Sequence, residues 1–66
     1  MATDIRHTNW VPFGHHGYSH YRIWQEFNGR DWFQRHEWKR DDGSLSLDDW
    51  IPGAKGWCID AQPIAA

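Results

Sequence analysis

The sequence has few aliphatic side chains, which limits the kind of core that it can build. Its 66 residues include only eight valines, leucines and isoleucines, whereas it has six Trp, three Phe and two Tyr. One aromatic side chain can bury about 150–250 Å², so any core of this chain is largely aromatic. A chain this short buries only roughly 60% of the surface that its unfolded form exposes. We therefore expect one domain, residues 1–66, with some aromatic side chains left on its surface.

Cysteine is almost absent, and no long apolar run is present. A single Cys58 cannot close a disulfide within the chain, which excludes a small secreted scaffold held together by disulfides. No apolar run approaches the length that spans a membrane, and residues 1–7 lack the apolar segment of a signal peptide. We therefore expect an intracellular protein, cytoplasmic or carried in a virion, with no membrane partner.

An excess of basic residues is also missing. Lys and Arg number seven against nine Asp and Glu, so the formal net charge is −2. Nucleic-acid backbones are bound by concentrated Lys and Arg. The one basic cluster, Arg35, Lys39 and Arg40, is followed at once by Asp41 and Asp42. This balance argues against nucleic acid as the partner.

The sequence does contain a strong β-hairpin signal. Residues 18–27 and 30–39 are two runs rich in β-branched and aromatic side chains, and Asn28-Gly29 lies between them. Asn-Gly between such runs is the strongest short-range indication of a hairpin. The fold class that we predict is small and mostly β, an antiparallel meander of three or four strands around the central hairpin 18–27/30–39. Residues 1–17 are predicted to form an N-terminal arm or loop, and residues 61–66 a loosely held tail.

The segments after the hairpin leave two interpretations open. Leu45 and Leu47 alternate with serines, which suits a short third strand. Ser46-Leu47-Asp48-Asp49 has instead the pattern of a capping box, which would open one short helical turn near residues 46–51. Residues 56–60 are predicted to form a final strand.

The pairing register of the hairpin depends on the length of its loop. A two-residue Asn28-Gly29 turn would place Arg22 opposite Arg35, and like charges directly opposite each other are destabilising. A three-residue loop that begins at Phe27, with Gly29 in the left-handed conformation, avoids this repulsion. We prefer the three-residue loop, in which the cross-strand pairs are Glu26 with Arg30, Trp24 with Trp32, Arg22 with Gln34, His20 with His36 and Tyr18 with Trp38.

The preferred register gathers large aromatic and cationic side chains on one face. Trp, Tyr and Arg are the residue types that dominate protein–protein hot spots. We therefore predict that the chain is not an enzyme but a protein-binding or assembly module, whose partner is another protein or a second copy. Small chains of this kind include virus-encoded accessory proteins, such as inhibitors and minor virion components. The predicted partner-binding residues are Tyr18, Arg22, Trp24, Trp32 and Trp38.

Histidine offers an alternative use of the same face. The five histidines include His20 and His36, which lie opposite each other in the preferred register, with Cβ atoms about 5 Å apart. Two imidazoles at this distance can share a Zn²⁺ ion, so these residues are the candidate metal ligands, although no HExxH or paired CxxC motif accompanies them. The same rings could instead stack on a sugar or on the bases of a single-stranded nucleic acid. No other cofactor is expected.

One stretch resembles a known family. Residues 29–36 are similar to the middle strand of WW domains, and Trp50-Ile51-Pro52 is similar to their closing Trp-x-x-Pro with one residue fewer. Membership would imply the binding of proline-rich peptides. The spacing departs from the family pattern, because fourteen positions separate His36 from Trp50, about twice what the family allows. We interpret the resemblance as convergent hairpin chemistry.

Overall fold

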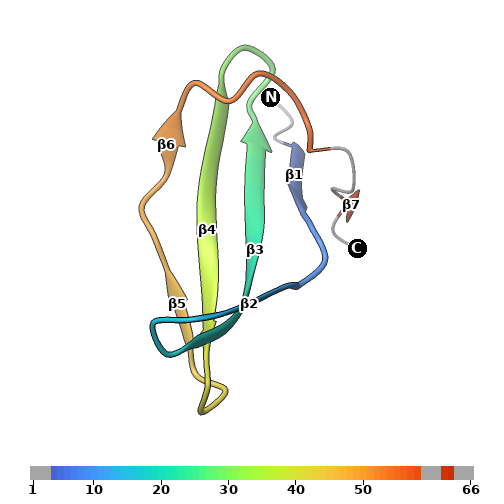
Figure 1. Ribbon diagram of the computed structural model, residues 1–66. Helices are drawn as coiled ribbons and strands as arrows, with labels where there is room; N and C mark the ends of the chain where they lie inside the picture. Colours follow the sequence, from blue (N-terminus) through green and yellow to red (C-terminus); the bar gives the residue numbers. More distant parts are fainter. Residues whose placement is uncertain (1–3, 59–61, 64–66) are drawn as a thin grey trace.

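A computed structural model describes residues 4–58 and 62–63 of the chain. These residues contain no helix, and they form one antiparallel sheet (Figure 1). The prediction of a small β domain built around a hairpin is therefore confirmed. The strands are β1 (Asp4–His7), β2 (Val11–His15), β3 (Tyr18–Phe27), β4 (Trp32–Arg40), β5 (Leu45–Leu47), β6 (Ile51–Pro52) and β7 (Gln62–Pro63).

The two long strands lie at the centre, and the outer edge of each is covered by two short strands. β1 and β2 both pair with β3, and β5 and β6 both pair with β4. Figure 1 shows this arrangement, with β7 beyond β1. Unpaired backbone groups on a strand edge need partners, and the short strands supply them. This is why the described sheet has more strands than the three or four expected.

Two local predictions are corrected. The predicted N-terminal arm instead contributes β1 and β2, which satisfy the outer edge of β3. The helical turn near residues 46–51 is absent, because residues 45–47 pair with β4 as a strand and residues 48–50 have no regular structure.

The C-terminal predictions are tested only in part. Residues 56–58 are not in a strand, and the remainder of the predicted strand 56–60 lies outside the described residues. Within the predicted tail 61–66, residues 62–63 pair with β1, while the other residues of the tail are outside the described part.

The β3–β4 loop has four residues, one more than predicted. The backbone N–H of Asn28 donates to the carbonyl of Asp31 at 3.3 Å. The side-chain oxygen of Asn28 accepts from the N–H groups of Arg30 and Asp31, at 2.9 and 2.7 Å. Gly29 has a φ of 96°, the left-handed conformation that was expected of it. The Asn28 side chain therefore closes a wider loop, in which Phe27 faces Trp32.

This loop makes the predicted register wrong. The pairing shifts by an odd number of residues, and the side chains of a strand alternate between the two sides of a sheet, so residues expected to share a face are separated. The repulsion between Arg22 and Arg35 is still avoided, because Arg22 now faces a glutamate. The observed pairs are Arg22 with Glu37, Trp24 with Arg35, His20 with Lys39, Tyr18 with Arg40 and Glu26 with Phe33.

The sheet has no buried apolar core within the residues that the structure describes. The only side chains there that are less than 9% exposed are polar, namely Thr8, Gln25 and Glu37. The molecule measures 38 × 24 × 19 Å along its principal axes. A single layer of strands leaves both faces half-covered, so aromatic side chains on each face replace a central core.

The buried polar residues hold the layer together. Thr8 lies in the gap between β1 and β2, where its hydroxyl oxygen accepts from the backbone N–H of Ile23 at 3.1 Å. Gln25 fastens the C-terminal segment to the sheet, since its amide nitrogen donates to the carbonyl of Gly56 at 2.8 Å and its oxygen accepts from the N–H of Cys58 at 2.6 Å. Each of these contacts satisfies a backbone group with a side-chain partner.

Candidate functional site

The observed register divides the predicted partner-binding residues between the two faces of the sheet. Trp24 and Arg22 lie on one face, which we name the Trp24 face. Tyr18, Trp32 and Trp38 lie on the other, the Trp38 face. The assignment follows from strand alternation and from the pairing of β3 with β4. The single face that the sequence predicted is therefore not formed.

On the Trp24 face, cations lie against tryptophan rings. The Arg22 guanidinium carbon is 4.3 Å from the ring centroid of Trp10 and 5.1 Å from that of Trp24. The Lys39 ammonium nitrogen is 4.4 Å from the same Trp10 ring. Cation–π contacts of this kind contribute about 0.5–1 kcal/mol each at exposed sites. Arg22 thus contacts both indoles, Trp10 and Trp24.

Glu37 neutralises one of these cations. It is 5% exposed, and its carboxylate accepts from Nε of Arg22 and, at 2.8 Å, from the indole N–H of Trp24. A buried carboxylate is stable only where it is paired and hydrogen-bonded. Glu37 therefore fixes Arg22 and Trp24 relative to each other, and its negative charge is balanced by the hydrogen bonds that these two side chains donate to it.

A pocket of about 240 Å³ opens beside Trp24. The guanidinium carbon of Arg35 lies 4.9 Å from the centroid of Trp50. Its Nε is buried and has no hydrogen-bond partner. Among the ion pairs of the described residues, none includes Arg35. The pocket therefore combines an apolar wall with an uncompensated positive charge. Its lining residues are Ile5, Trp24, Arg35, Leu47 and Trp50, and we name it the Trp24–Trp50 pocket.

The Trp38 face carries two groups of aromatic rings, and the rings within each group contact one another. In the first, Trp38 is central: its centroid is 5.1 Å from Phe13, 5.3 Å from Tyr18 and 5.5 Å from Tyr21. Its indole N–H donates to the Asp48 carboxylate at 3.1 Å. Tilted and edge-on ring pairs of this kind are favourable, so these side chains are used in packing within the chain.

The second group lies at the opposite end of the hairpin. Trp32 stacks on Phe27 with centroids 4.5 Å apart and meets Trp57 edge-on at 4.7 Å. Arg6 covers Trp57 at 4.3 Å and forms an ion pair with Asp4 at 3.1 Å. The C-terminal segment thus covers Trp32, which the sequence had placed in the partner-binding surface.

The predicted metal ligands are not brought together. His20 faces Lys39 and lies on the Trp24 face, with its Nδ1 2.9 Å from the hydroxyl oxygen of Ser19. His36 lies on the Trp38 face, where it stacks on Trp38 at 5.7 Å. Across the described ranges, no group of three or more His, Cys, Asp or Glu side chains is arranged to hold a metal ion.

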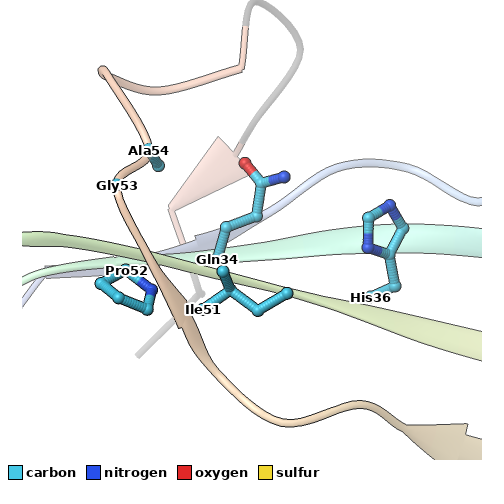
Figure 2. Close-up of a pocket in the computed structure, with 6 residues that line it drawn as sticks. All are labelled: Gln34, His36, Ile51, Pro52, Gly53 and Ala54. Carbon is cyan, nitrogen blue, oxygen red and sulfur yellow. The ribbon is translucent and has the colours of Figure 1, made fainter.

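A second hollow lies on the Trp38 face, where β6 runs beside β4. It encloses about 210 Å³. Figure 2 shows Gln34 and His36 projecting from the same side of β4, with Ile51 and Pro52 of β6 at the Gln34 end of the hollow. Gln34 accepts a hydrogen bond from Gln25 at 3.1 Å. Ile51 is 61% exposed, so this hollow is shallow on its β6 side.

Sequence reasoning missed most of the Trp24–Trp50 pocket. Trp24 was identified, whereas Arg35, Leu47 and Trp50 were not assigned to any site, and Ile5 was placed in the arm. The positions of these residues depend on the register and on the pairing of β1 and β5 with the central strands. The one available signal was the alternation of Leu45 and Leu47, which favoured a strand, one of the two interpretations that the sequence left open and the one that the structure shows.

Comparison with protein-family models, with curated proteins and with solved structures finds no match to this chain. The WW-like stretch therefore carries no family assignment. Within the described part of the chain there is no helix long and apolar enough to cross a membrane.

Proposed function

We propose that this protein is a non-enzymatic protein-binding module whose contact surface is the Trp24 face. The observation that carries the proposal is the open Trp24–Trp50 pocket on a sheet that buries no apolar side chain among its described residues. Trp and Arg are the residue types that most often dominate protein–protein hot spots. A partner that covers the pocket would bury apolar surface that the chain itself leaves half-exposed.

We favour the Trp24 face over the Trp38 face as the contact surface because the chain leaves apolar side chains of the Trp24 face exposed. Leu45 and Leu47 are 51% and 52% exposed, and their pairing with Lys39 and Glu37 places both on the Trp24 face. They extend the apolar surface from the pocket to the edge of the sheet. The rings of the Trp38 face, in contrast, contact one another or the segment around Trp57.

A protein partner is favoured over a nucleic acid by charge. The chain carries a net charge of −2, and Arg22 is neutralised by Glu37. Binding to a nucleic-acid backbone requires several free cations along one track. Trp24 and Trp50, the two indoles of the pocket, are not in ring contact with each other among the described residues, so they do not form a continuous platform for successive bases.

Two neighbouring residues provide a matched test. Leu47 and Ile51 are both more than half exposed, and they lie on opposite faces of the sheet, Leu47 beside Glu37 and Ile51 beside Gln34. Displayed random twelve-residue peptides would be selected on the immobilised full chain, and the affinity of the selected peptides measured by fluorescence anisotropy. We expect L47D to weaken binding at least tenfold and I51D to leave it unchanged.

Two results would contradict the proposal. One is that no peptide binds above the background of an unrelated β-sheet protein while the chain is also monomeric by light scattering. The other is that L47D and I51D weaken binding equally. A dimer that L47D dissociates and I51D preserves would support the assembly form of the same proposal, with a second copy as the partner.

A further inference from the structure

Two arginines of this chain share two features and differ in a third. Arg6 and Arg35 each lie over a tryptophan ring, at 4.3 Å and 4.9 Å from the centroid, and each has a buried Nε without a hydrogen-bond partner. Arg6 has a carboxylate beside it, since its terminal nitrogen is 3.1 Å from Asp4. No ion pair within the described residues includes Arg35. Among the described residues, Arg35 therefore lacks the carboxylate neighbour that Arg6 has.

Among the described residues, no carboxylate forms an ion pair with Arg35. Glu26 lies on the same face, but it does not line the pocket, and no ion pair of the described residues includes it either. The other lining residues are apolar or aromatic. Glu37, two residues along the same strand and on the same face, already accepts from Arg22 and Trp24. The buried Nε of Arg35 lies among apolar neighbours, and an ionised acceptor that reaches the guanidinium forms a hydrogen bond about twice as strong as a neutral one.

We infer that the Trp24–Trp50 pocket binds a carboxylate carried on an apolar part of the partner, so that the partner is an acidic peptide segment. The inference rests on the proposed function and names the chemistry of its ligand. The carboxylate accepts from the Arg35 guanidinium, while the adjoining hydrocarbon packs between the indoles of Trp24 and Trp50. Arg35 is the residue that determines specificity.

The size and charge of the pocket favour a peptide carboxylate over a phosphate backbone. A volume of about 240 Å³ accommodates one large side chain, not a run of nucleotides. Among the described residues, Arg35 is the one cation that lines the pocket, which suits one carboxylate, whereas a polyanion needs several cations. The apolar lining also favours a ligand that carries hydrocarbon next to its charge.

The first experiment uses a minimal probe on the full chain. Hexanoate, hexylamine and hexan-1-ol have the same hydrocarbon and differ in charge. Their binding would be followed by the indole N–H signals of Trp24 and Trp50 in ¹⁵N-correlated NMR spectra, with Trp57 as the internal control. We expect saturable shifts at Trp24 and Trp50 with hexanoate, and affinity at least tenfold lower for the other two compounds.

Matched variants assign the effect to one arginine. R35Q should lower hexanoate affinity at least tenfold, R35K should restore part of it because the charge is kept, and R6Q should leave it unchanged. A dispersed spectrum of each variant shows that it is folded, and R35K keeps the test decisive if R35Q unfolds. Equal binding of hexanoate and hexylamine, or unchanged hexanoate affinity in R35Q, would overturn the inference.

The second experiment separates the inference from the proposed function. Selected peptides would be compared with versions in which each glutamate or aspartate is replaced by its amide. Loss of affinity in wild type but not in R35Q supports the inference. Peptide binding that depends on Leu47 but not on the acidic residues or on Arg35 keeps the proposed function and overturns this inference. Hexanoate binding without any peptide binding supports a carboxylate site at Arg35 but overturns the peptide partner, and the proposed function with it. Salt-sensitive binding of a twelve-nucleotide oligothymidine in preference to acidic peptides would overturn both.

Discussion

Phe27 lies opposite Trp32 at the two ends of the β3–β4 loop, and their rings stack with centroids 4.5 Å apart and planes inclined by 26°. This pair closes the hairpin at its loop end. The four residues between them are held by Asn28, whose side chain accepts two backbone N–H groups. The loop therefore sets the register, and the register decides which side chains share a face.

Removal of the Asn28 side-chain acceptor should weaken the loop. In N28A, the N–H groups of Arg30 and Asp31 lose their partner. Both are exposed and can turn to water, so we expect the free energy of unfolding to fall by about 1 kcal/mol. N28D keeps an oxygen in the same place and should remain close to wild type. Urea denaturation followed by tryptophan fluorescence measures both, and equal stability of N28A and wild type would contradict this account of the register.

The hairpin could be predicted from the sequence because its signals are local. Alternating β-branched and aromatic residues on both sides of Asn28-Gly29 indicate two paired strands whatever the rest of the chain does. The loop length could not be obtained in the same way. Cross-strand pairing energies argued against the two-residue turn. They did not include the two hydrogen bonds that the Asn28 side-chain oxygen accepts, which favour a loop of four residues over one of three.

Only part of the candidate site could be predicted from the sequence, because the other part depends on contacts between residues distant in sequence. Arg22 and Trp24 belong to the hairpin and were recognised as surface residues of a binding type. Trp10 and Trp50 lie in segments with no periodicity, and their placement over Arg22 and Arg35 arises from contacts distant in sequence. Such contacts follow from which edge strand pairs with which long strand, and the local pattern does not contain that information.

Glu37 is expected to be the most sensitive position on the Trp24 face. E37Q removes the negative charge that Arg22 and Trp24 share. Because the carboxylate is 5% exposed, its loss leaves Arg22 without a counter-charge in partly buried surroundings. We expect the free energy of unfolding to fall by about 1–3 kcal/mol.

Two further variants separate charge from packing at this position. E26Q changes a half-buried carboxylate of the same face for which no side-chain hydrogen bond is found in the described residues, and it should have little effect. A thermodynamic cycle of R22Q, E37Q and the double variant R22Q/E37Q gives the coupling free energy between the two side chains. We expect it to show that the interaction of Arg22 with Glu37 stabilises the folded state. Additive effects of R22Q and E37Q would show that the two side chains do not interact energetically.

His16 offers a stabilising substitution. It is the non-glycine residue with positive φ in the described chain, at 56°, and together with Gly17, at 81°, it connects β2 to β3. Two consecutive left-handed residues form the hairpin turn for which Asn-Gly is the preferred sequence. A left-handed conformation costs most residues roughly 1–2 kcal/mol and costs Asn less. H16N should therefore raise the midpoint of urea unfolding, whereas H15N, in the adjoining strand, should not. A lower midpoint for H16N would contradict the turn assignment.

Asp42 gives the turn between β4 and β5 a dependence on pH. Its carboxylate accepts from the hydroxyl of Ser44 at 2.7 Å and from the backbone N–H of Ser44 at 2.9 Å. These hydrogen bonds, the side-chain one first, lower the pKa of Asp42 below its ordinary value of 3.8. A carboxyl whose pKa is lower in the folded state stabilises that state above the ordinary pKa. The contribution is lost as the pH falls through the lower, folded-state pKa. We therefore expect the Ser44 amide signal to move at a pH below 3.8, with a midpoint that matches the titration of the Asp42 carboxyl carbon in ¹³C NMR spectra.

In S44A the hydroxyl is absent, so the Asp42 midpoint should rise toward 3.8, while S46A, in the neighbouring strand, should leave it in place. An Asp42 midpoint at or above 3.8 in the wild-type chain would show that Ser44 does not hold the carboxylate in solution.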